Sequence, residues 1–180
     1  MPKLIIELTG EHFRRRYLLY VVEVSHGTSR YFYVGQTGDT RVITARPVFR
    51  RLAAHLEDRK STQNQVYQYV AHDILGVSQS EGKATAFTEA TREAVEKYLV
   101  GSHIKMYAYQ LERFQSDATS EEHASIRRKT QKMESQIIAL FRKNERKVIN
   151  QKPSPPFSVG DCPYPEILKQ VAEDFDLSTK

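Results

Sequence analysis

The sequence predicts a small α+β (α/β) fold in which helices flank a sheet that contains antiparallel strands. Residues 17–24 and 30–36 are rich in Tyr, Val and Phe, and the five residues between them have turn chemistry. These two segments therefore predict a β-hairpin. A third core strand is expected at residues 104–114, and an amphipathic helix follows it from residue 120 to about 143.

Apolar periodicity, proline and glycine define the other elements of the body. Residues 3–8 are expected to form a short strand. A helix is predicted to open at Pro47 and to run to residue 56, and a second is predicted over about 64–75. A third helix is expected over 88–100, where the following glycine ends it.

The C-terminal part is predicted to be an appendage. Residues 153–156 are proline-rich, and residues 164–177 have their apolar side chains on one side of a predicted helix. We therefore divide the chain into a domain at residues 1–152, with a helical insertion at about 76–100, and a linker with a C-terminal helix at 153–180.

Composition limits the classes of protein that the chain can represent. A length of 180 residues suits one domain with a hydrophobic core, and a charged content of 27% is ordinary for a soluble protein. No apolar run approaches the roughly 18 residues of a membrane span, and the first residues lack a secretion signal pattern. The single cysteine excludes an intrachain disulfide and a cysteine-rich zinc site. We expect a cytoplasmic protein.

Charge is unevenly distributed. Residues 153–180 hold two lysines and five acidic residues, a net charge of −3. Because the whole chain has a net charge of +5, the other residues carry +8. A basic body is typical of proteins that bind a polyanion, and DNA is the expected partner. The alternative is a well-solvated surface with no such partner.

Two tyrosines of the predicted hairpin are candidates for chemistry. Tyr20 and Tyr33 belong to strands of opposite direction, so their hydroxyls could approach each other. A phenol close to a cation can position a water nucleophile or take its proton. Packing in the core is the alternative for either residue. Gly35 allows a backbone or a ligand to come close at the strand end.

Arg51 and His55 form the next candidate pair. Their spacing places both side chains on one face of the predicted helix, at the rim of its apolar side. An arginine can clamp a phosphate and offset charge that develops in a transition state. A histidine can orient a tyrosine or relay a proton. The same spacing also occurs on solvated helix edges.

Glu134 is the candidate metal ligand. It precedes Ile137 and Phe141 by three and seven positions, so its side chain points toward the buried side of the long helix. A buried carboxylate needs a cation. Mg²⁺ is one option because it often takes one or two carboxylates with phosphate oxygens and water. A salt bridge to Arg51 or a lysine is the other.

These residues together resemble the motifs of the GIY-YIG nuclease family. Tyr33-Val34-Gly35 is the second half of the name motif, and Leu18-Leu19-Tyr20 stands in place of Gly-Ile-Tyr and keeps the tyrosine. Arg51-x-x-x-His55, Glu134 and Asn150 fall where the family has its helix pair, its metal-binding glutamate and its asparagine. The resemblance covers residues 17–56 and 104–152.

One departure from the family concerns the arginine. The loop between Gly35 and Arg51 is longer than in compact members, which leaves Arg41 or Arg46 as substitutes. The spacing to His55 favours Arg51.

The resemblance implies a three-stranded antiparallel sheet flanked by helices and Mg²⁺-dependent hydrolysis of DNA, with Mn²⁺ able to substitute. It implies a metal on Glu134, an arginine that neutralises developing charge, and a tyrosine that positions or deprotonates the attacking water. The implied catalytic set is Tyr20, Tyr33, Arg51, His55, Glu134 and Asn150.

Two other functions compete with an endonuclease. The chain could be a catalytically inactive nucleic-acid-binding module of the same fold, or an interaction protein that does not bind nucleic acid. For an endonuclease with one active site, double-strand cleavage would need a homodimer or two successive events.

Overall fold

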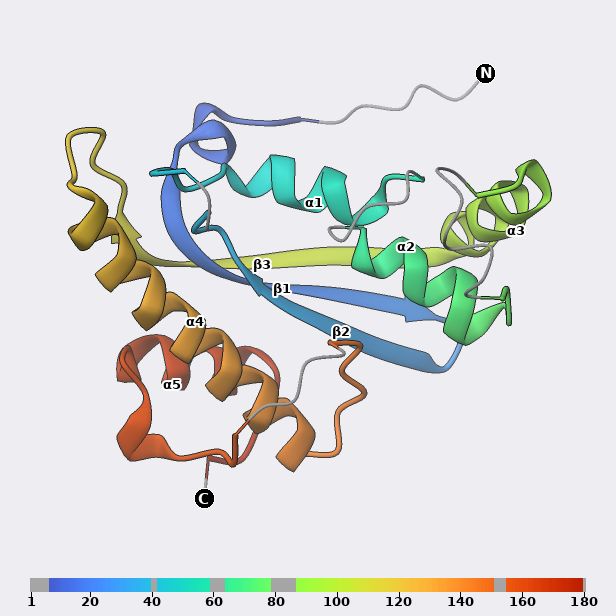
Figure 1. Ribbon diagram of the computed structural model, residues 1–180. Coiled ribbons are helices and arrows are strands. Elements are labelled where there is room, and N and C mark those ends of the chain that lie inside the picture. The colour runs from blue at the N-terminus through green and yellow to red at the C-terminus, as the bar shows by residue number, and fades with distance from the viewer. Residues whose placement is uncertain (1–6, 40–41, 59–63, 79–86, 151–154, 180) are drawn as a thin grey trace.

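A computed structural model describes the chain at residues 7–39, 42–58, 64–78, 87–150 and 155–179. Its centre is an antiparallel sheet of three strands in the order β2-β1-β3 (Figure 1). The strands are β1 (Arg16–His26), β2 (Ser29–Gln36) and β3 (Ser102–Arg113). The predicted α+β class and the predicted hairpin are therefore confirmed.

Strand β1 lies in the middle of the sheet because it can be buried on both faces. Its residues 17–24 are all buried, and most of them are apolar. The β1–β2 pairing continues to the pair His26 and Ser29, so only two residues form the turn. The turn is shorter than predicted because the backbone ladder continues through polar residues at both strand ends.

One face of the sheet is covered by the first three helices (Figure 1). They are α1 (Val48–Leu56), α2 (Gln65–Tyr69), which continues as a π-helical turn at Val70–Ile74, and α3 (Glu89–Val100). The core on this side includes Tyr20, Val22, Val24, Tyr31, Val66, Val70 and Val95.

The opposite face is covered by α4 (Ser120–Lys143) and α5 (Pro165–Asp174) (Figure 1). Residues of α5 are buried with those of α4, and the Phe175 ring lies 5.6 Å from Phe32 and 5.1 Å from Phe141. The predicted apolar side of the C-terminal helix thus packs on the body. Its buried residues form part of this half of the core.

Several predicted segments lie partly outside the described residues. The strand expected at 3–8 does so at residues 3–6, and the described Glu7 and Leu8 belong to no strand. Of the expected insertion, residues 79–86 lie outside the description, and α3 packs Val95 into the core. Residues 153–154 of the expected linker also lie outside it. Within the described part of the chain, none of the helices has the length and apolar character needed to cross a membrane.

The free edge of β2 is covered by the chain that follows α4. The Phe32 amide donates to the Lys147 carbonyl, and the Ile149 amide donates to the Phe32 carbonyl, both at 2.9 Å. This short parallel bridge brings residues 147–150 beside β2. The segment therefore protects one stretch of an edge strand and places Asn150 next to Val34.

Candidate active site

The candidate site forms around Tyr20 in the central strand. Tyr20 is fully buried and lies opposite Gly35 in the β1–β2 ladder. A Cβ atom on Gly35 would lie 2.5 Å from Tyr20 Cζ and would overlap the hydroxyl oxygen. The ring therefore lies across the glycine, which explains why this strand position has no side chain.

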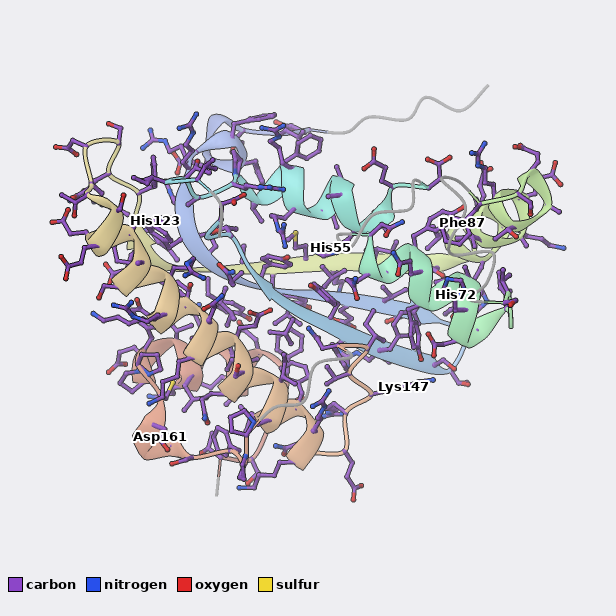
Figure 2. All side chains as sticks on the ribbon, in the orientation of Figure 1. His55, His72, Phe87, His123, Lys147 and Asp161 are labelled. Atoms are coloured by element: carbon purple, nitrogen blue, oxygen red, sulfur yellow. The ribbon has the colours of Figure 1, made fainter. Side chains whose placement is uncertain are left out.

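The Tyr20 hydroxyl is held by two side chains from one face of α1. Arg51 donates to the Tyr20 oxygen from Nε at 3.0 Å and from Nη2 at 2.8 Å. The hydroxyl also lies 2.8 Å from His55 Nε2. His55 is fully buried and lies between α1 and the sheet (Figure 2). Arg51 and His55 thus lie at successive turns on one face of α1, as predicted, and both side chains contact the same phenol oxygen.

The tautomer of His55 sets the direction of its hydrogen bond with Tyr20. A phenol oxygen has one proton to donate and lone pairs to accept, whereas a guanidinium can only donate. Arg51 occupies the accepting side of Tyr20, so the hydroxyl proton is directed toward His55 Nε2 in the tautomer whose Nε2 carries no proton. His55 is then the acceptor, and a path for a proton leads from the Tyr20 oxygen to the imidazole.

The ionisation of Tyr20 follows from the same surroundings. Burial raises its pKa to about 12, although the charge and hydrogen bonds of Arg51 act in the opposite direction. Tyr20 is therefore a neutral phenol at pH 7. It is not present as a phenolate base.

Tyr33 lies beside this pair. Its ring centroid is 4.4 Å from that of His55 and 6.3 Å from that of Tyr20. Burial is the main cause of a pKa well above the usual value for its hydroxyl, and the neighbouring Tyr20 raises it further. The two hairpin tyrosines are thus brought together, as their antiparallel placement predicted.

Glu134 approaches the same group from α4. Its side chain is only half-buried, so the prediction of a residue that faces the apolar side is met in part. Burial is the first cause of the raised pKa values of Tyr20 and Tyr33, and the carboxylate charge of Glu134 adds to both. Burial lowers the pKa of Arg51, but Tyr20, Tyr33 and Glu134 together outweigh it. These shifts place Glu134 within electrostatic reach of the tyrosines and the arginine.

Asn150 contributes through the backbone. Its Oδ1 accepts from the Val34 amide at 2.9 Å, and its Nδ2 donates to the Val34 carbonyl at 2.7 Å. The side chain therefore imitates the ladder partner that β2 lacks at this position. Because Val34 adjoins Tyr33, Asn150 positions the strand that bears the tyrosine.

The alternatives to Arg51 differ from it in their contacts. Arg46 donates to the carboxylate of Asp39 at 2.7 and 3.1 Å. Arg41 lies outside the described residues. Arg51 is thus the described candidate whose guanidinium is directed at Tyr20.

A cavity of about 680 Å³ lies on the other side of α1. Its lining includes Phe49, Arg50 and Ala53, which occupy helix positions away from the Arg51–His55 face. The cavity is consequently separate from the tyrosine group, although the same helix borders both.

His123 was not recognised from the sequence. Its Nδ1 lies 2.5 Å from the Tyr17 hydroxyl, and its Nε2 donates to the Asp39 carbonyl at 3.0 Å. It ties the loop between β2 and α1 to the first turns of α4 (Figure 2). In the sequence, the periodicity of α4 places His123 on the same face as Glu134. That position alone does not indicate which residues the histidine contacts.

The described residues contain no group of three or more His, Cys, Asp or Glu side chains that could hold a metal. Glu134 is therefore the carboxylate that the described site itself offers. A single carboxylate suits Mg²⁺, which commonly completes its octahedral shell with water and substrate phosphate oxygens. It does not suit zinc, whose structural and catalytic sites take three or four protein ligands.

The chain matches no protein-family model, no curated protein and no solved structure.

Proposed function

We propose that the protein is a metal-dependent endonuclease of the GIY-YIG type that hydrolyses DNA phosphodiester bonds. The main support is the Tyr20 hydroxyl, which accepts two hydrogen bonds from Arg51 and is 2.8 Å from His55 Nε2. A core tyrosine with a purely structural role needs one partner at most. Here a cation and a proton acceptor converge on one phenol oxygen, as general acid–base chemistry on a phosphate requires.

The attacking water is positioned by Tyr20. Since its pKa is about 12, Tyr20 acts as a neutral phenol. As the water oxygen bonds to phosphorus, the Tyr20 oxygen gives up one of its two hydrogen bonds from Arg51 and accepts the water proton, while its own proton passes to His55 Nε2. The bond between phosphorus and the leaving oxygen breaks, and the leaving oxygen takes a proton from solvent water, which leaves a phosphate monoester and an alcohol. Tyr33 packs against the imidazole and keeps it in register with Tyr20.

Arg51 stabilises the charge of the transition state. Its Nε and one Nη2 hydrogen bind Tyr20, which leaves Nη1 for an oxygen of the scissile phosphate. Such a donor is already oriented before reaction, so no reorganisation is needed when charge develops.

The residue that would hold Mg²⁺ is Glu134. The ion would supply Lewis acidity toward the phosphate oxygens and the leaving oxygen. Without it, the carboxylate would repel a phosphate, and the charge of Arg51 would only partly offset that repulsion.

DNA is the proposed substrate because residues 1–152 account for a net charge of +8. Phosphate contacts of such a body give sequence-independent affinity that falls steeply with salt. One site of this kind cuts one strand in each engagement, so we expect nicked circles before linear DNA unless two copies act together.

The deciding experiment is incubation of the purified protein with supercoiled plasmid and Mg²⁺, Mn²⁺ or EDTA. We expect nicking with either metal and intact plasmid with EDTA. Salt-dependent binding of DNA with no cleavage in any metal would instead support an inactive binding module of the same fold. Neither binding nor cleavage would refute both nucleic-acid functions.

A further inference from the structure

We propose that Arg127 is a second phosphate contact, which holds the DNA backbone a few nucleotides from the scissile phosphate. This inference rests on the proposed function, because it assigns a further part of the substrate to the same site. The ligand is a phosphodiester group of the strand that is cut.

Helix α4 presents one line of side chains to the end of β2. Near the start of the helix, His123 Nε2 donates to the Asp39 carbonyl at 3.0 Å. Two turns later, the hydroxyl of Thr130 lies 3.5 Å from Gln36 Oε1. As α4 advances, its contacts therefore move back along the chain toward β2, and the next turn of the helix brings Glu134 to the tyrosines.

Arg127 lies on this line between His123 and Thr130. Its Cγ is 3.4 Å from the position that a Cβ atom on Gly38 would take, so the stem of the side chain packs over that glycine. The side chain of Gln36 binds both the amide and the carbonyl of Gly38 and fixes the turn beneath the arginine. The stem of Arg127 is thus held at the exit of the strand that bears Tyr33.

The guanidinium of Arg127 differs from those of other half-buried arginines. Arg16, Arg46, Arg51 and Arg92 each donate to an acceptor on another residue of the chain. Over the described ranges, the side chain of Arg127 makes no hydrogen bond or ion pair. Arg127 is half-buried as a residue, and a bound anion would accept hydrogen bonds that its guanidinium does not make within the described fold.

The spacing to Glu134 fits one DNA strand. Seven residues of α-helix rise about 10 Å, and two residues seven apart lie on nearly the same face. With α4 along the duplex axis, that distance corresponds to about three nucleotide steps of one strand, at about 3.4 Å of axis per step. The planar fork of arginine matches the two free oxygens of a phosphate. Arg127 would therefore bind a phosphate about three steps from the one that is cleaved.

The test is the salt dependence of binding to a short duplex in EDTA, where cleavage cannot interfere. Wild type is compared with Arg127→Gln, Arg127→Lys and the control Arg128→Gln, whose side chain is exposed at the next helix position. We expect Arg127→Gln to bind about tenfold more weakly at low salt. It should also reduce the slope of log affinity against log salt by about 0.9, which is one phosphate contact.

The charge-conserving Arg127→Lys variant should retain the wild-type slope, and Arg128→Gln should change the slope by much less than one contact. Melting temperatures measured in parallel show whether each variant is folded. Equal losses for the Arg127 and Arg128 variants would overturn the inference, because net charge alone would then explain them. If the wild-type protein binds and cuts DNA but Arg127→Gln leaves the slope unchanged, the phosphate contact of Arg127 is refuted and the nuclease function stands. If Arg127→Gln loses one phosphate contact but the wild-type protein never cuts DNA, the contact of Arg127 is upheld and the nuclease function is refuted.

Discussion

The ring of Tyr20 occupies the space that a side chain on Gly35 would need, because an added Cβ would lie 2.5 Å from Tyr20 Cζ. The ring cannot simply rotate away, since its hydroxyl is bound to Arg51 and His55. We expect Gly35→Ala to destabilise the protein by about 1–3 kcal/mol, as overpacking does, and to reduce cleavage more than a hundredfold. Urea unfolding and plasmid nicking measure both effects. Gly160→Ala, with no atom within 4 Å of the added Cβ, is the control.

Arg51→Ala should slow cleavage by about two to three powers of ten, which is the usual cost of one transition-state donor. Arg51→Lys should recover only part of the rate, because an ammonium cannot bind Tyr20 and a phosphate in the same fork. Single-turnover rates on a nicking substrate give the comparison. Arg50→Ala is the matched control, since Arg50 is exposed and belongs to the outer side of α1. A normal rate for Arg51→Ala would move the role to another arginine.

Glu134→Gln removes the proposed metal ligand while keeping the size of the side chain. We expect metal-dependent cleavage to fall by about three powers of ten or more, and DNA binding in EDTA to persist or strengthen as a negative charge is lost. Stability should change by no more than about 1 kcal/mol, because the side chain is only half-buried. A large fall in melting temperature with residual Mg²⁺-dependent cleavage would identify Glu134 as a structural residue.

Asn150→Asp separates the two hydrogen bonds that the Asn150 side chain makes with the backbone of Val34. The aspartate can still accept from the Val34 amide but cannot donate to the Val34 carbonyl. We expect a loss of about 1–3 kcal/mol at pH 7, together with a lower rate of cleavage because β2 carries Tyr33. Equilibrium unfolding provides the measurement. If Asn150 touched the substrate instead, cleavage would fall without any loss of stability.

Alkaline pH should destabilise the protein through its buried tyrosines. The folded pKa of Tyr20 is about 12, against about 10 in an unfolded chain, so the unfolded state loses the proton first. The contribution of Tyr20 is complete below pH 10 and is lost as pH rises toward 12, by about 1.4 kcal/mol per pH unit. The free energy of unfolding, measured between pH 9 and 11.5, should fall less steeply in Tyr20→Phe than in wild type. Parallel slopes would show that Tyr20 ionises normally.

The sequence alone was sufficient for the elements whose pattern is local. Alternating and β-branched residues predicted the hairpin, and the helical spacing of Arg51 and His55 put both on one face of α1, where the structure has them. The predicted start of α4 at residue 120 is also where the structure has it, and Thr119 forms a capping box with Glu122 there. Such features depend on a few neighbouring residues, so the sequence pattern is enough to predict them.

Contacts between distant segments were decided only by the tertiary structure. Asn150 and Val34 are 116 positions apart, and no local pattern indicates that an amide will replace a missing strand partner. The degree of burial of Glu134 and the place of Phe175 in the core likewise depend on how α4 and α5 pack against the sheet. Periodicity shows which side of a helix is apolar, but the surface that covers this side comes from other parts of the chain. The sequence therefore determined the candidate groups, and the packing of the helices on the two faces of the sheet determined which of them meet at Tyr20.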